Sequence, residues 1–142
     1  HIHRYQVLEK DLAGRPLPCP VLYPGSVERT AFAERDEEKG FVTLEVETDP
    51  LTGGRMRKIA FHGLPARPMI DATVEADGLG ETALADALGR VLASLPPDAI
   101  VRLALRGRGA PGAENALRAA RLRDLAPPTM NVTVRRAGGG QG

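Results

Sequence analysis

Residues 70–105 read IDATVEADGLGETALADALGRVLASLPPDAIVRLAL, and this stretch decides the fold class. Apolar and polar side chains alternate over residues 70–75, which is the period of a half-buried strand. Over residues 81–95 apolar side chains recur every three or four positions, which predicts one apolar face of a helix. The Pro-Pro pair at 96–97 ends this helix, because proline cannot continue the backbone hydrogen-bond ladder. Alternation returns over residues 101–106, so the stretch predicts a strand, a helix and a second strand.

The flanking sequence extends this pattern in both directions. Upstream, residues 41–48 alternate as a strand, and the stretch 49–54, which contains proline and glycine, predicts a hairpin loop. This loop leads into a second strand over residues 55–61. Downstream, the apolar spacing predicts a second helix over residues 111–125, and renewed alternation predicts a last strand over 130–135.

The predicted order over residues 41–136 is therefore β-β-β-α-β-α-β. Most strands have one apolar face, so we expect an α+β fold of two layers, with two helices packed on one face of a mixed sheet. Residues 1–40 contain several prolines and little periodicity, which predicts an extended arm of strands and loops. The glycine-rich residues 137–142 predict a flexible tail. Because the chain begins with His1, we expect a fragment or processed product whose arm is the end of a larger domain.

The composition is that of an ordinary folded protein. The 142 residues are 42% hydrophobic and 26% charged, with a formal net charge of +1. No uncharged run approaches the roughly 18 residues that a membrane helix needs, so we expect no membrane segment. The single cysteine, Cys19, excludes an internal disulfide and a cysteine-based zinc site, and it favours a reducing cytoplasm.

The small net charge conceals blocks of opposite sign. Residues 28–49 and 69–98 each carry −5, whereas residues 99–142 hold eight arginines and two acidic residues, giving +6. Positive charge of this kind favours contact with the phosphates of a nucleic acid. The alternative is a solvated surface on which Glu114 and Asp124 neutralise neighbouring arginines. The candidate DNA-contacting residues of this block are Arg106, Arg108, Arg118 and Arg121.

The first three residues, His1-Ile2-His3, form an H-x-H pattern. In an extended chain, residues i and i+2 project to the same side, so both imidazoles can reach one cluster of metal ions. Imidazole nitrogen is a good ligand for zinc, manganese or iron. The alternative is a chance pair of histidines, because no carboxylates with a recognisable ligand spacing stand nearby.

Two further segments give these histidines a context. Residues 23–26 read YPGS, and residues 34–41 read ERDEEKGF. Together with the opening HIHR, they resemble the end of the catalytic domain in the SbcD family. These proteins are nuclease subunits of the bacterial SbcC–SbcD complex for DNA double-strand-break repair, within the calcineurin-like metallophosphoesterases. The recognisable motifs lie within residues 1–75.

The resemblance implies an exonuclease that hydrolyses DNA phosphodiesters with a metal-activated water at a two-manganese centre. His1 would bind one ion and His3 the other, and each ring would donate its second N–H to a partner that the sequence does not identify. Ser26 and Arg29 would lie at the rim of the active site near a phosphate, or else serve as a turn former and a rim ion pair. Residues 41–136 would form a capping domain that orients DNA ends. An SbcC-like ATPase would be the partner, and a homodimer is also open.

Two other interpretations stay open. One is a different metallophosphoesterase that acts on small phosphodiesters, and the other is a non-catalytic protein-interaction module. The earlier motifs of the SbcD family, which supply the other metal ligands, are not in this chain. We therefore expect the 142 residues alone to be inactive, because metal affinity depends on the number of ligands. The lone His62 is expected to be structural or solvated.

Overall fold

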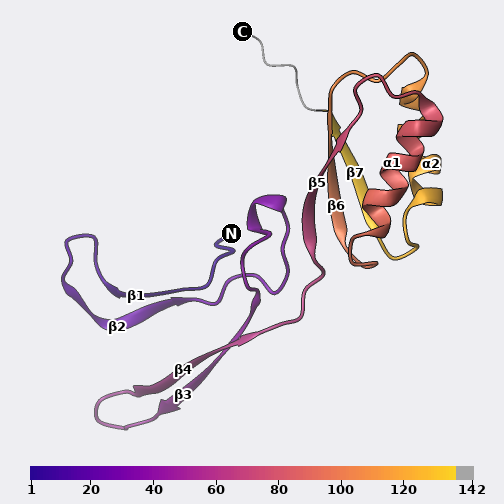
Figure 1. Ribbon diagram of the computed structural model, residues 1–142. Coiled ribbons are helices and arrows are strands. Elements are labelled where there is room, and N and C mark those ends of the chain that lie inside the picture. Colours follow the sequence, from indigo (N-terminus) through magenta and orange to yellow (C-terminus); the bar gives the residue numbers. More distant parts are fainter. Residues whose placement is uncertain (137–142) are drawn as a thin grey trace. The chain divides into compact units, whose positions relative to one another are not determined.

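The computed structural model describes residues 1–136, and the predicted tail at 137–142 lies outside them. The chain divides into two compact units, which we call unit 1 (residues 1–66) and unit 2 (from Arg67 onward) (Figure 1). The longest helix of the described part has 13 residues, and no helix there has the length and apolar character needed to cross a membrane.

Unit 1 consists of two β-hairpins. β1 (Gln6–Lys10) pairs antiparallel with β2 (Pro16–Tyr23), and β3 (Gly40–Glu47) pairs antiparallel with β4 (Arg55–Gly63). A short 3-10 turn, η1 (Phe32–Glu34), lies in the segment that connects the hairpins. The proline-rich start of the chain thus forms strands and loops, as its composition predicts.

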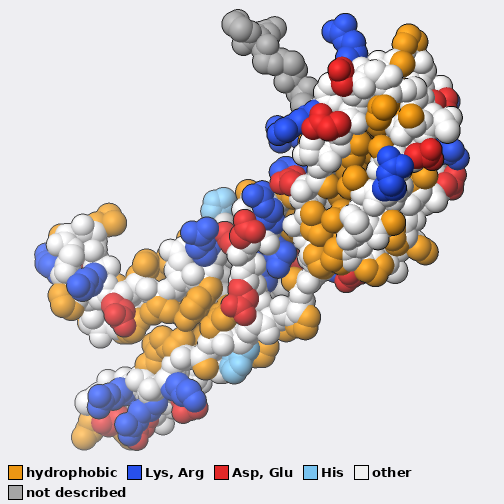
Figure 2. All heavy atoms as spheres, in the orientation of Figure 1, with side chains coloured by type: hydrophobic (Ala, Val, Ile, Leu, Met, Phe, Trp, Pro, Cys, Tyr) orange, Lys and Arg blue, Asp and Glu red, His pale blue; other side chains and the backbone are white. Residues whose placement is uncertain are grey.

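Unit 1 has little apolar core. None of the buried apolar side chains falls within residues 1–66, all of which are described, and Leu44 and Val46 of β3 are 47% and 59% exposed. Figure 2 shows apolar side chains at the surface of both hairpins. The rings of Tyr5 and Phe61 stack with their centroids 4.7 Å apart, which joins the start of the chain to β4. Apolar burial is therefore small in unit 1, and its polar contacts matter correspondingly more.

Unit 2 is a three-stranded parallel sheet covered by helices. The sheet order is β5-β6-β7, and the two helices lie in the crossover connections, as parallel pairing requires (Figure 1). In chain order the elements are β5 (Met69–Glu75), α1 (Glu81–Ala93), β6 (Ile100–Arg106), the 3-10 turn η2 (Ala113–Leu117), α2 (Ala119–Leu125) and β7 (Asn131–Arg136).

The core of unit 2 lies between the sheet and the helices. Leu88 of α1 and the β6 residues Val101 and Leu103 are completely buried in one apolar cluster. Alternate residues of the strands point to the other face of the sheet. There Arg102 of β6 donates from Nη2 to the Asp71 carboxylate of β5 at 2.8 Å. One face is therefore apolar and covered, and the opposite face is polar.

The α+β class with two helices and the predicted order of elements are confirmed. The five strands of residues 40–136, however, fall into two separate sheets, β3-β4 and β5-β6-β7, and not into one mixed sheet. One-face alternation predicts a half-buried strand, and this is wrong for β3, whose Leu44 and Val46 are exposed. Alternation also does not show which strand is the neighbour. β4 and β5 do not pair with each other. Pro65 and Pro68 lie in the segment between them, and proline has no N–H to donate to a strand ladder. Along the chain, the division between the two compact units lies at 66/67, whereas the sequence pattern predicts a boundary at 40/41.

The predicted second helix is broken into two pieces. Arg118 has extended backbone angles (φ −64°, ψ 140°) between η2 and α2. The break has a packing reason, because Ala116 and Leu122 are both buried. Six residues apart, they would point about 120° away from each other on a continuous α-helix. The change of direction at Arg118 allows both side chains to face the same core.

Candidate functional site

The imidazole of His3 is held by a carboxylate. His3 Nδ1 lies 2.8 Å from Glu34 Oε1, and the hydroxyl oxygen of Thr30 lies 3.2 Å from the same nitrogen. Since these contacts use Nδ1, the other ring nitrogen, Nε2, is left to bind a ligand. A carboxylate on the second ring nitrogen is the usual arrangement around a metal-binding histidine, where it fixes the tautomer and the orientation of the ring.

Glu34 is held as an anion. Its pKa is lowered from 4.5 to about 2, first because the backbone N–H of Thr30 donates to the carboxylate and next because of the hydrogen bond with His3. The nearby Lys39 ammonium lowers the pKa further. An ionised carboxylate has no proton to donate, so the His3 ring is the donor, from Nδ1, in its contact with Glu34. The neutral tautomer with its proton on Nδ1 carries the lone pair on Nε2.

This shift leads to a pH prediction with a definite sign. The folded-state pKa of Glu34 lies below the unfolded value, so its contacts stabilise unit 1 fully above about pH 4.5 and are lost as the pH falls toward 2. In a carboxyl NMR titration we expect a midpoint near 2 for Glu34 in the wild-type chain. His3→Ala should raise this midpoint, and His62→Ala should leave it unchanged. A wild-type midpoint close to 4.5 would contradict the described contacts.

Lys39 contacts both the backbone of His3 and the acidic segment at residues 34–37. Its side chain is only 2% exposed, although it carries a charge. The ammonium donates to the backbone carbonyl of His3 at 2.9 Å and to the Glu37 carboxylate at 2.9 Å. Arg4 donates to Glu37 from the other side, with Nη2 at 2.9 Å from the carboxylate. Charged contacts therefore fix the backbone on which the His3 ring is mounted.

The YPGS turn packs directly on the H-x-H segment. The backbone N–H of Ser26 donates to the carbonyl oxygen of His3 at 3.0 Å. Gly25 has a φ of +80°, and a Cβ at this position would lie 2.8 Å from that same carbonyl oxygen. Only glycine meets both requirements, the left-handed backbone and the close approach. Residues 34–39, residues 23–26 and His3 thus meet at one place in unit 1.

Ser26 and Arg29 take part in contacts that shape this loop. The Ser26 hydroxyl donates to the carbonyl oxygen of Glu28 at 2.8 Å, and Arg29 Nε donates to the carbonyl oxygen of Glu37 at 3.2 Å. The Ser26 contact is that of a turn former, and the Arg29 contact joins its side chain to the backbone of Glu37. The expected rim ion pair of Arg29 stays a prediction. His62 stacks on Phe41 with centroids 4.9 Å apart, as suits a structural histidine.

The metal-ligand set in the described residues does not form a site on its own. His1 and His3 are both exposed, but within residues 1–136 no three side chains of His, Cys, Asp or Glu converge in a way that could hold an ion. His3 fits the role of a single manganese ligand, because its Nε2 is available and its ring is oriented. The two histidines do not fit a complete two-metal centre, which needs several more donors.

The four candidate arginines of unit 2 fall into two groups. Arg106 ends β6 and Arg108 follows it in the next loop, at the carboxyl ends of the parallel strands. Arg118 and Arg121 lie instead at the start of α2. All four are exposed. The expected neutralising pairs of Glu114 and Asp124 with these arginines are not found among the ion pairs of the described residues.

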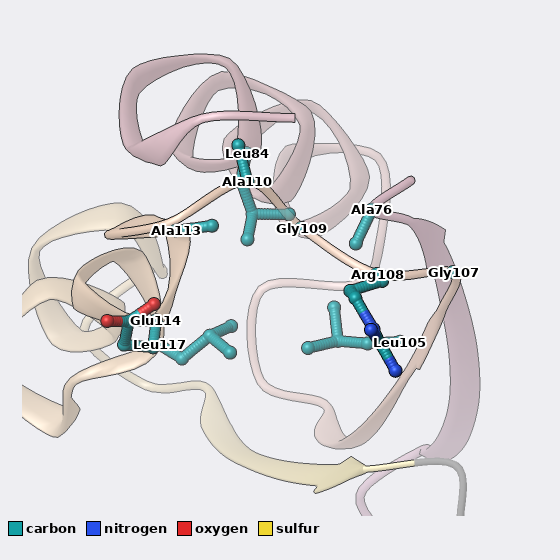
Figure 3. Close-up of a pocket in the computed structure, with 10 residues that line it drawn as sticks. All are labelled: Ala76, Leu84, Leu105, Gly107, Arg108, Gly109, Ala110, Ala113, Glu114 and Leu117. Carbon is teal, nitrogen blue, oxygen red and sulfur yellow. The ribbon is translucent and has the colours of Figure 1, made fainter. Parts of the chain in front are cut away.

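Arg108 lines a small pocket at the carboxyl ends of β5 and β6. The pocket has a volume of about 290 Å³, and Figure 3 shows Arg108 and Glu114 on opposite sides of it. Gly107, with a φ of +81°, permits the loop to approach Asp77, whose carboxylate accepts the Arg108 backbone N–H at 3.1 Å. Of the four candidate arginines, only Arg108 lines this pocket.

Comparison with models of known protein families finds no match to this chain, and comparison with curated proteins finds none either. The residues themselves and the contacts between them therefore carry what can be inferred about function. The partners of His3, namely Glu34, Thr30 and Lys39, were not predicted from the sequence. The sequence feature that points toward these partners is the acidic segment beginning at residue 34. Its contact with His3 depends on the fold and is not visible in the sequence.

Proposed function

We propose that this chain is the C-terminal part of an SbcD-like DNA exonuclease that acts in the cytoplasm with an SbcC-like ATPase. One observation supports this proposal above the others. The three segments on which the family resemblance rests, HIHR, YPGS and ERDEEKGF, meet at the backbone and ring of His3. If each segment resembled the family only by chance, we would not expect the three segments to contact one another.

The contacts suit the role that the resemblance implies for His3. The Glu34 carboxylate orients the ring, and both the Ser26 N–H and the Lys39 ammonium hold its carbonyl oxygen. Manganese, when bound in the whole protein, would supply the activated water that attacks a phosphodiester. What this chain contributes is one oriented imidazole, whose backbone carbonyl is held by the YPGS turn, with His1 as the second expected ligand. The other ligands would come from the earlier part of the protein.

The test of this function uses the natural protein that contains residues 1–142. Supplied with manganese, it should degrade linear duplex DNA from the ends, and degradation should stop when the metal is chelated. Bis(4-nitrophenyl) phosphate serves as the comparison substrate. Hydrolysis of this small diester without any degradation of DNA would favour the other metallophosphoesterase interpretation. If neither substrate is hydrolysed, the nuclease proposal is wrong.

Unit 2 is proposed to position the DNA end through its exposed arginines. Each phosphate contact releases counterions, so the slope of log affinity against log salt falls by about 0.9 for every contact that is removed. We expect the double variant Arg118→Ala/Arg121→Ala of the chain to lower the slope for duplex DNA by about 1 to 2. Arg90→Ala, which removes an exposed charge from α1, should leave the slope unchanged. An unchanged slope in the double variant would exclude these two arginines from the DNA interface.

A further inference from the structure

A groove runs along β7, the edge strand of the unit 2 sheet. It has a volume of about 740 Å³ and lies between β7 and the segment formed by η2, α2 and the loop that follows. It is larger than the pocket at Arg108, and its walls are mainly apolar. The apolar side chains that line it include Leu117, Leu122, Ala126, Pro128, Val132 and Val134.

The backbone of β7 offers hydrogen-bonding groups next to this groove. The Asn131 N–H donates to the Ala99 carbonyl oxygen at 3.1 Å, at the start of the parallel ladder with β6. In such a ladder alternate residues face the neighbouring strand. Thr133 therefore faces β6 as well, and the N–H and C=O groups of Val132 and Val134 face outward. An outward row of this kind is a template for one more strand.

Charge around the groove selects the occupant. Arg123 lines the groove, and Arg135 lies exposed on β7. Neither has an ion pair with another residue of the described chain, and residues 99–142 carry +6 overall. A second copy of the same edge would bring two positive surfaces together, which is a common protection against self-pairing of edge strands. An acidic strand is attracted by the same charges.

We propose that β7 and this groove bind an extended, acidic segment of a partner protein by strand addition. The partner backbone pairs with Val132 and Val134. Because side chains of a strand alternate between the two faces, every second partner residue enters the groove and is apolar. The residues between them lie beside Arg135 on the open face of the sheet and are acidic. This site does not depend on the proposed nuclease function.

The experiment uses the 142-residue chain and a short synthetic peptide in which glutamate and valine alternate. We expect saturable binding, with the backbone amide signals of Val132 and Val134 shifted and protected from exchange in NMR spectra. A peptide with lysine in place of glutamate should bind at least about tenfold more weakly, because its charges are repelled. Methylation of the peptide backbone nitrogens should abolish binding, since it removes the donors of the new ladder.

Two chain variants test the same site from the protein side. Val134→Pro removes an N–H that β6 does not use, so the sheet should keep its ladder while peptide affinity falls about tenfold or more. Arg135→Glu should weaken binding about three- to tenfold, because Arg135 lies beside the acidic residues of the partner strand, and Arg90→Glu, on the exposed side of α1, should not. If Val134→Pro fails to fold, the methylated peptide and the amide shifts still decide the question.

Several results would overturn the proposal. Equal affinity for the glutamate and lysine peptides would remove the charge argument. Amide shifts confined to residues away from β7 would place the peptide elsewhere. Concentration-dependent dimers that use the Val132 and Val134 amides would identify a second copy as the occupant. Displacement of the peptide by duplex DNA, with the same amides shifted by DNA, would assign this edge to nucleic acid.

Discussion

Replacement of His3 with alanine is expected to reduce manganese-dependent DNA degradation by more than about a hundredfold in the natural protein that contains this chain. The reason is the geometry at Nδ1, where Glu34 and Thr30 contact the ring and leave Nε2 for the proposed manganese ion. Loss of a residue that only orients a metal ligand costs about 10–100-fold, so loss of the ligand itself should cost more. The measurement is the initial rate of degradation of linear duplex DNA at saturating manganese.

His62→Ala is the matched control for this variant. It makes the same chemical change at a histidine that stacks on Phe41 and hydrogen-bonds with Thr43, away from the His3 contacts. Its rate should stay near that of the wild-type protein. The degradation rate of the Glu34→Gln protein should lie between the rates of these two variants. Its manganese affinity should be about 10–100-fold weaker, because an amide orients the ring less strongly than a carboxylate. A folded His3→Ala protein with the wild-type rate would show that His3 is not a metal ligand.

The parts of the site that can be predicted from the sequence are those formed by consecutive residues. H-x-H and YPGS are short motifs, and each is visible without knowledge of the fold. Glu34 is different, because it lies 31 residues from His3 and meets it only through the turn at Gly25 and the buried Lys39. Nothing in local spacing predicts such a contact. The charge of Lys39 would ordinarily place it at the surface, yet it is buried because two carboxylates and a carbonyl oxygen surround its ammonium.

The fold shows the same division between local and non-local information. The periods of α1 and of the strands are local properties, and they were predicted correctly. Sheet partnership is non-local, so the separation of β4 from β5 was not visible in the alternation of either strand. The break at Arg118 was missed for a related reason, since apolar spacing across residues 113–125 fits a continuous helix. Only the shared burial of Ala116 and Leu122 reveals why the chain turns there.

The second large effect concerns the stability of unit 2. Leu88 of α1 is completely buried beside Val101 and Leu103, so Leu88→Ala leaves a cavity that the surrounding side chains cannot fill completely. We expect a loss of about 3 kcal/mol in the free energy of unfolding. Since the total for an ordinary domain is about 5–15 kcal/mol, this loss is a large fraction of what holds unit 2 folded.

Leu51→Ala provides the control, because it removes the same atoms from a side chain that is 95% exposed in the loop between β3 and β4. Its effect should stay within about 0.5 kcal/mol. Urea unfolding followed by NMR resolves the two units through their own amide signals. Because unit 1 contributes no buried apolar side chain, its contacts at His3 and Lys39 do not depend on the cavity in unit 2. Leu88→Ala should therefore shift the transition of unit 2 to lower urea and leave the amides around His3 unchanged. An equal shift of both transitions would mean that the two units unfold as one cooperative domain. A loss in the free energy of unfolding below about 1 kcal/mol would mean that the side chains around residue 88 move in to fill the cavity.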